Sequence, residues 1–136
     1  MEFSTPDLAT LYNGYLNIKG ALVNTDVKKT QTVAQNLVSS LEGKPDLKNA
    51  RQVAVLIAKE ESVDKQREFF VGLTDEVLTS IKGNITKGKV VQQMCPMAFE
   101  GRGGFWLSNS KEVRNPYFGD EMLVCGAVVK EFSSVQ

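Results

Sequence analysis

Apolar residues recur at helical spacing through most of the first 81 residues, and this periodicity favours a mainly α fold. The first helical stretch follows Thr5-Pro6-Asp7, which is typical of a helix start. Thr5 can cap the helix, Pro6 suits its first turn, and Asp7 meets the positive end of its dipole. Asp26 and Asp46 are expected to cap the second and third helices. The apolar stripes cover residues 8–23, 27–41, 47–58 and 63–81.

Short connections make sequential helices antiparallel neighbours, so we predict an antiparallel four-helix bundle over residues 5–83. Each helix has one apolar stripe, and four such stripes can bury one another. Gly83 follows the last stripe as a natural stop, and we expect the helices to end near Lys82.

After Gly83 glycines become frequent and the helical periodicity is lost. Three short runs rich in β-branched and aromatic residues are typical of strands, at 89–94, 104–107 and 127–132. We therefore predict a single domain over residues 1–136, in which residues 84–136 form a small irregular lobe with short β-strands. The lobe is expected to fold back on the bundle, with Trp106 largely buried.

Charge and composition exclude several classes of function. Sixteen basic and sixteen acidic residues cancel without forming blocks, so no nucleic-acid partner is expected. No apolar run approaches the ~20 residues of a membrane span. The chain has no histidine, which removes Ser-His triads and the commonest zinc ligand. Since no acid–base pair or activated nucleophile can be assembled, we expect this protein not to be an enzyme.

Sulfur-containing side chains gather in two short runs, residues 94–97 and residues 122–126. Both cysteines and three of the four methionines lie there. Thiolate and thioether ligands select soft ions, Cu(I) above all, because polarisable sulfur matches a polarisable ion. A disulfide, or two buried thiols among core methionines, would explain the same residues.

The candidate metal ligands are Cys95, Met97, Met122 and Cys125. Cys95 and Met97 lie two apart around Pro96, so in an extended segment they point to the same side. Met122 and Cys125 lie three apart, so they share a face only if Met122 is in a turn. We expect Cys95 and Cys125 to lie close together, with Met97 or Met122 aimed between them. Each thiol must lose a proton to bind metal.

Four C-terminal motifs, at residues 95–98, 105–108, 113–119 and 122–126, resemble a bacterial domain family of unknown function. That family occurs as stand-alone extracytoplasmic proteins and attached to periplasmic adaptor subunits of copper/silver efflux systems. The helical part resembles it more loosely, at residues 15–23 and 66–69. The resemblance implies heavy-metal handling in the periplasm or another extracytoplasmic place. The polar start of the chain lacks a basic n-region, so we expect the leader to be absent from this sequence.

Cys-Pro-Met also resembles the start of the short heavy-metal-binding modules of copper-transporting ATPases, where a His commonly follows. Ala98 takes that place here, so the resemblance implies a site of Cys and Met only and makes zinc less favoured. Arg67 matches a characteristic position on the helical side of the extracytoplasmic family. We expect Arg67 to link the bundle to the lobe.

Two functional hypotheses follow. In the first, the protein is a periplasmic binding module that sequesters or passes on Cu(I), or Ag(I), in heavy-metal efflux or homeostasis. In the second, it is a structural or interaction domain that docks on an efflux adaptor or another envelope protein. Cys95 and Cys125 would then form a disulfide or remain buried thiols. Sulfur–sulfur distances separate the hypotheses, since a disulfide bond is about 2.05 Å long.

Overall fold

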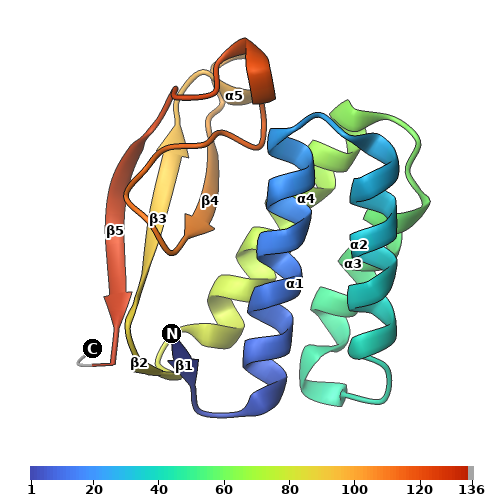
Figure 1. Cartoon of the computed structure of the whole chain (residues 1–136), viewed down its shortest axis with the longest axis vertical. Coiled ribbons are helices and arrows are strands. Elements are labelled where there is room, and N and C mark those ends of the chain that lie inside the picture. Colours follow the sequence, from blue (N-terminus) through green and yellow to red (C-terminus); the bar gives the residue numbers. More distant parts are fainter. Residues whose placement is uncertain (135–136) are drawn as a thin grey trace.

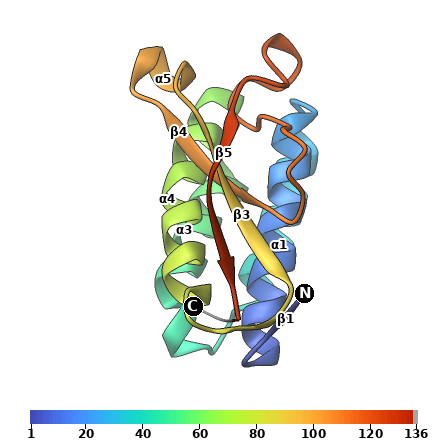
Figure 2. The same ribbon diagram turned by 90° about the vertical axis from the view of Figure 1, so that its left-hand side faces the viewer.

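Helices and strands form three layers in the computed structural model, which describes residues 1–134 (Figure 1). Each long helix packs against the next one in sequence, and α1 also packs against α4. The sheet covers α1 and α4, so these two helices lie between the sheet and the pair α2 and α3 (Figures 1 and 2). The predicted mainly helical fold with small antiparallel sheets is confirmed. The long helices are α1 (Pro6–Val23), α2 (Val27–Ser40), α3 (Lys48–Lys59) and α4 (Val63–Ile81).

The helix ends agree with the sequence except at α3. The Thr5 hydroxyl accepts a hydrogen bond from the Leu8 amide at 3.3 Å, and Asp26 caps α2 in the same way. The prediction for Asp46 is wrong, because this residue lies inside the 3₁₀ turn η1 (Pro45–Leu47) and does not cap α3. The last of the four long helices ends at Ile81, next to the predicted Lys82. No helix within residues 1–134 is long and apolar enough to cross a membrane.

The three predicted strands form one antiparallel sheet in the order β4-β3-β5. In its register, Gln93 of the central strand lies opposite Trp106 and Val128. A second, two-stranded sheet joins the N-terminus to the segment after α4 and was not expected from the sequence. The strands are β1 (Glu2–Phe3), β2 (Ile85–Lys87), β3 (Lys89–Cys95), β4 (Gly104–Ser108) and β5 (Ala127–Ser133), with short turns α5 (Ala98–Gly101) and η2 (Gly119–Glu121) between them.

Trp106 is completely buried, as predicted, and belongs to an aromatic cluster that joins the sheet to α4. Its ring meets Tyr117 edge-on with the centroids 6.0 Å apart, and Tyr117 packs against Phe70 of α4. The indole Nε1 donates to Gln93 Oε1 at 2.6 Å, so the buried polar atom of Trp106 is satisfied. The lobe is therefore a layer of the common core.

Tyr15 joins its own helix, α1, to α4 and to β4. Its ring stacks on Phe70 at 4.7 Å, and its hydroxyl accepts a hydrogen bond from the Leu107 amide of β4 at 2.9 Å. The hydroxyl also lies 2.9 Å from Thr74 Oγ1, whose own proton goes to the Phe70 carbonyl. Tyr15 therefore donates to Thr74, and one side chain holds α1, α4 and β4 together.

Candidate functional site

The two cysteines meet beside α5, at the upper end of the sheet in Figure 1. Both are free, and their Sγ atoms lie 3.0 Å apart. Cys95 ends β3 and is fully buried, whereas Cys125 precedes β5 and is partly exposed. The pairing of Met94 with Ala127 across β3 and β5 brings the two thiols together. The predicted proximity of the cysteines is confirmed.

The 3.0 Å separation of the two Sγ atoms lies between the distances expected for a bond and for a shared metal. A disulfide would bring the sulfurs to about 2.05 Å. A tetrahedral metal with sulfur bonds of about 2.3 Å would hold them about 3.8 Å apart. Each state therefore needs a shift of about 1 Å or less in the sulfur separation, which side-chain rotation can supply.

The contact with Cys95 changes the acidity of the Cys125 thiol. A hydrogen bond with Cys95, burial and the charge that Cys95 would carry all raise the pKa of the Cys125 thiol. A backbone hydrogen bond from Met97 acts in the opposite direction and lowers this pKa. The backbone at Met97 therefore lies close to the Cys125 sulfur.

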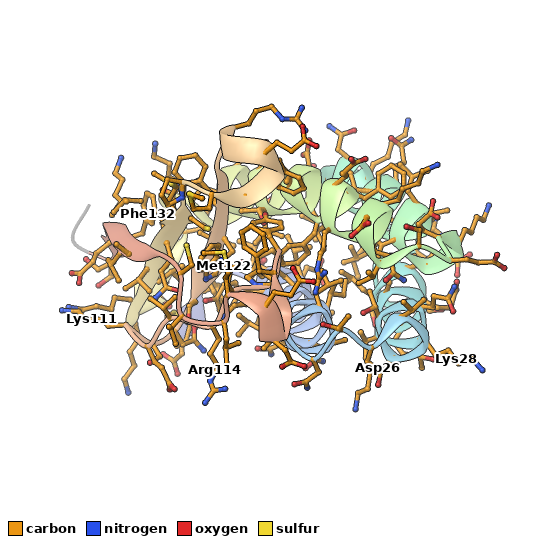
Figure 3. All side chains as sticks on the ribbon, turned by 90° about the horizontal axis from the view of Figure 1, so that it is seen from above. Asp26, Lys28, Lys111, Arg114, Met122 and Phe132 are labelled. Atoms are coloured by element: carbon orange, nitrogen blue, oxygen red, sulfur yellow. The ribbon has the colours of Figure 1, made fainter. Side chains whose placement is uncertain are left out.

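The two candidate methionines lie at the surface, with Met97 55% and Met122 37% exposed. Met122 directly follows η2, and its carbonyl accepts a hydrogen bond from the Cys125 amide at 3.1 Å. The turn that a ligand role for Met122 required is therefore present. Figure 3 shows Met122 among the side chains at this end of the molecule. Met94 alternates with Cys95 along β3, so its side chain points to the other face of the sheet.

Asn115 positions Cys125, a role that was not predicted from the sequence. Asn115 is fully buried, and its Nδ2 donates to the Cys125 carbonyl at 2.9 Å. Its backbone amide donates to the Leu123 carbonyl, while its Oδ1 accepts from the Tyr117 amide at 2.8 Å. Asn115 followed by Pro116 is typical of a turn and does not by itself indicate a contact with Cys125. The hydrogen bond from the Tyr117 amide to the Asn115 side chain, two residues earlier, defines an Asx turn, which Asn commonly forms.

Arg67 links the helices to the C-terminal layer, as expected. Its Nε donates to the Pro116 carbonyl at 2.8 Å. Its Nη2 donates to the Leu22 carbonyl at 3.0 Å and to Thr25 Oγ1 at 3.2 Å. Burial lowers the pKa of this guanidinium, and the charges of Asp64 and Glu121 partly oppose the effect.

The donor set around the cysteine pair is chemically soft. Within residues 1–134, no three His, Cys, Asp or Glu side chains gather in a way that could hold a metal ion. A metal at the pair would therefore have the two thiolates as its protein ligands, and Met97 and Met122 are the thioethers close to them in the sequence. That set suits Cu(I), whereas structural zinc sites use four nitrogen, sulfur or oxygen ligands.

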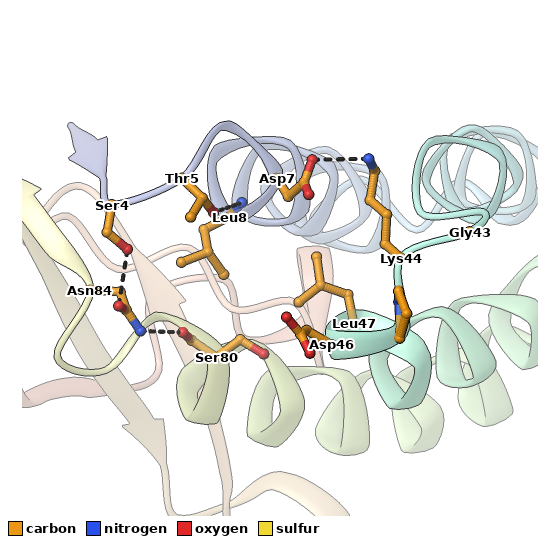
Figure 4. A pocket seen from close by; sticks show the side chains of 11 residues that line it. Ser4, Thr5, Asp7, Leu8, Gly43, Lys44, Asp46, Leu47, Ser80 and Asn84 are labelled. Atoms are coloured by element: carbon orange, nitrogen blue, oxygen red, sulfur yellow. Dashed lines mark hydrogen bonds and ion pairs between the residues drawn. The ribbon is translucent and has the colours of Figure 1, made fainter.

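A separate polar hollow of about 440 Å³ lies at the opposite end of the molecule, between the start of α1, η1 and the end of α4 (Figure 4). Lys44 and Asp7 form an ion pair there at 3.0 Å. The Ser4 hydroxyl donates to Asn84, which in turn donates to the Ser80 carbonyl. Because these groups satisfy one another, the hollow has the character of a structural junction.

Comparison with known proteins identifies one family. A family model described as "Protein of unknown function (DUF3347)" matches residues 11–88. The matched range covers most of α1 and all of α2, α3 and α4, and it ends before β3 and both sulfur-containing runs. No curated protein and no solved structure matches this chain.

Proposed function

Because this chain belongs to the DUF3347 family, whose function is unknown, we propose a function from its own geometry: it is a soft-metal binding module. The metal is Cu(I), or Ag(I), held between Cys95 and Cys125. The observation that carries this proposal is the 3.0 Å approach of two free thiols that lie 30 residues apart in the sequence.

The surroundings of the pair support a soft ion. Gly104, opposite Cys95 in the register, has no side chain, and no His or carboxylate completes a cluster there within residues 1–134. Hard ions such as Mg²⁺ and Ca²⁺ prefer oxygen ligands, which the pair does not offer. Cu(I) prefers thiolate and thioether sulfur.

In this proposal Met97 and Met122 are supplementary ligands. Their partial exposure leaves the unbranched side chains free to turn toward the thiols or toward an arriving ion. α1–α4 act as an antiparallel four-helix scaffold within a single domain, and the C-terminal layer carries the ligands. An exposed thioether two residues from a buried thiol would offer the ion a route from solvent to the interior of the site.

We further propose that the protein works in the periplasm or another extracytoplasmic place, and exchanges metal with an efflux adaptor or another envelope protein. The C-terminal motifs that resemble extracytoplasmic domains support this assignment. Met97 is 55% exposed and lies two residues after the buried Cys95. This placement supports transfer by ligand exchange, because a partner's sulfur can reach the ion from outside.

The test is an anaerobic titration of the reduced protein with Cu(I) against a competing chelator. Cys95→Ser and Cys125→Ser should each lower the affinity by orders of magnitude, because a neutral hydroxyl cannot replace a thiolate. Met97→Leu and Met122→Leu should give smaller losses, of about tenfold or less. Met94→Leu is the matched control, since it removes a thioether on the other face of the sheet.

Two results would refute metal binding at this pair. One is a parent protein that never competes with the chelator. The other is a pair of cysteine variants that bind Cu(I) as tightly as the parent. Far-ultraviolet circular dichroism of each variant establishes that the fold is retained, which a buried Cys→Ser change should permit at a cost of about 1–2 kcal/mol.

The 3.0 Å contact also supports disulfide formation between Cys95 and Cys125, and the second candidate function is a docking module that this disulfide stabilises. Mild oxidation with a disulfide reagent would then yield a monomer lacking both free thiols. Non-reducing electrophoresis and thiol counting distinguish this product from a dimer linked between chains. A protein isolated from an oxidising compartment with the disulfide intact, and inert to Cu(I) after reduction, would favour this second function.

A further inference from the structure

Solvent reaches the two thiols of the cysteine pair unequally. Cys95 is completely buried at the end of β3, whereas Cys125 is partly exposed in the segment before β5. That segment lies at the surface, since the neighbouring Val124 is 75% exposed. A reagent that arrives from solution therefore meets the Cys125 sulfur before the Cys95 sulfur.

The buried thiol lies within reach of the exposed one. Both cysteines are free, and their Sγ atoms are 3.0 Å apart. The pairing of Met94 with Ala127 and the hydrogen bond from Asn115 to the Cys125 carbonyl hold the two backbone segments beside each other. A second thiol held this close reacts within the same molecule, which favours it strongly over a thiol in solution.

An exposed thiol with a buried thiol behind it suits thiol–disulfide exchange. The exposed thiol reacts with a disulfide from solution, and the second thiol then displaces the reagent from the mixed disulfide. Exposure controls the first step, and proximity controls the second. Cys125 meets the first requirement and Cys95 meets the second.

We propose that the pair carries out thiol–disulfide exchange with a low-molecular-weight disulfide, and that Cys125 reacts first. The Cys125 thiolate attacks one sulfur of the reagent, so that a bond to Cys125 Sγ forms and the disulfide bond of the reagent breaks. One half of the reagent leaves as a thiolate and takes up the proton that Cys125 released. Cys95 then gives up its proton and attacks Cys125 Sγ, which forms the Cys95–Cys125 bond and expels the other half of the reagent as a thiol. The protein dithiol is oxidised to a disulfide, and the reagent is reduced to its thiol form.

The exchange regulates the metal site, a consequence that rests on the proposed function. A metal needs both sulfurs as thiolates, whereas the disulfide joins the same two sulfurs to each other. Closure of the disulfide therefore excludes the metal, and a bound metal in turn protects the thiols from the reagent. The site holds a soft ion only while it is reduced.

The first test treats the reduced, metal-free protein with glutathione disulfide and analyses acid-quenched samples by intact mass spectrometry. The parent should lose the hydrogens of both thiols and form a monomeric disulfide, with a glutathione adduct only as an intermediate. Peptide mapping of that intermediate should place the glutathione on Cys125. A parent that does not react, or that stops at a stable adduct, would overturn the exchange. An adduct found on Cys95 would overturn the order of the two steps.

Variants with a single cysteine test the order independently. Cys95→Ser should accumulate the glutathione adduct, because no second thiol is left to displace the glutathione. Cys125→Ser keeps only the buried thiol and should form its adduct about tenfold more slowly. In concentrated urea both thiols are exposed, so the two variants should react at similar rates. Equal rates in the folded variants, or a difference that persists in urea, would overturn the assignment of the first step to exposure.

The second test compares the reduced and the disulfide forms of the parent in the anaerobic Cu(I) titration against a chelator. The disulfide form should bind Cu(I) more weakly by orders of magnitude. Equal affinities of the two forms would overturn the regulation and leave the metal site in place. A reduced form that does not bind Cu(I) would overturn the proposed function, and with it the regulation, while the exchange at Cys125 and Cys95 would still stand on the first test.

Discussion

The guanidinium Nε of Arg67 donates to the carbonyl of Pro116 at 2.8 Å, joining two residues 49 positions apart. The same side chain reaches the Leu22 carbonyl at the end of α1. One arginine of α4 thus holds the last turn of another helix and the loop that leads to Cys125.

Arg67→Gln should lower the free energy of unfolding by about 2–4 kcal/mol, because carbonyls that are now hydrogen-bonded would be left buried without a donor. Urea denaturation followed by circular dichroism measures the change. Arg102→Gln is the control and should cost under about 0.5 kcal/mol, since Arg102 is exposed. Equal effects of the two substitutions would show that Arg67 is not a structural link.

Asn115→Ala should separate the thiols as well as destabilise the fold. It removes the donor to the Cys125 carbonyl and the acceptor of the Tyr117 amide, at an expected cost of about 2–3 kcal/mol. The readout specific to positioning is the rate of Cys95–Cys125 disulfide formation under a mild oxidant, which should fall severalfold. Asn17→Ala, on the exposed side of α1, should alter neither quantity appreciably, and a normal oxidation rate in Asn115→Ala would contradict the positioning role.

Gly126→Ala probes the close approach of the chain beside Cys125. Gly126 has φ of +146°, and a Cβ there would lie 2.8 Å from the Trp106 ring. We expect a loss of about 2–4 kcal/mol, from backbone strain and from displacement of a buried ring. Gly101→Ala is the matched control, because Gly101 also has positive φ but faces open space, so it should lose only about 1 kcal/mol. Thermal denaturation compares the two, and similar losses would refute the packing argument.

Lys19→Met should stabilise the protein at pH 7. Burial and Arg114 lower the pKa of Lys19 to about 8, with Glu112 acting in the opposite direction. Below that pH the folded protein carries a poorly solvated ammonium group. Between about pH 8 and the ordinary lysine pKa of about 10.5, the folded state releases a proton that the unfolded chain retains. The free energy of unfolding of the parent protein therefore increases as the pH rises through this range.

The advantage of Lys19→Met should therefore be about 1–2 kcal/mol at pH 7 and clearly smaller near pH 10. Urea denaturation at both pH values measures it. Lys87→Met, at an exposed strand position, should show no such pH-dependent difference. An advantage of Lys19→Met that does not change with pH would mean that the effect comes from packing alone.

Local signals in the sequence predicted most of the fold. Helical periodicity and caps such as Thr5 and Asp26 placed the four helices, and β-branched runs placed β3, β4 and β5. Asp46 was misassigned because Pro45 starts a 3₁₀ turn, which a helix-cap pattern alone does not distinguish from an α-helix start. The pairing of β1 with β2 was missed because strands of two and three residues have no detectable alternation.

The candidate site was predictable only in part. Clustering of sulfur in the sequence predicted that Cys95 and Cys125 meet, because rare side chains concentrated in two runs suggest a common location. The side-chain amides of Asn115 and Gln93 donate to backbone carbonyls that are distant in the sequence. No local sequence pattern predicts these hydrogen bonds, since any buried amide side chain can bond a loop carbonyl. The hydrogen bonds of Arg67 join α4 to the end of α1 and to the loop at Pro116, and only the tertiary structure brings these remote segments together.

The pairing of β5 with β3 determines when the two cysteines come into contact during folding. Neighbouring helices pack early because their contacts close short loops, whereas the Leu107–Tyr15 hydrogen bond spans 92 positions. Long loops cost more entropy to close, so we expect the sheet to dock on α1 only after neighbouring helices have packed. Until Ala127–Ser133 joins the sheet, Cys95 lies at an unfinished edge, open to solvent ions and oxidants. The paired thiols are therefore a late product of assembly, and their presence marks a chain that has completed its fold.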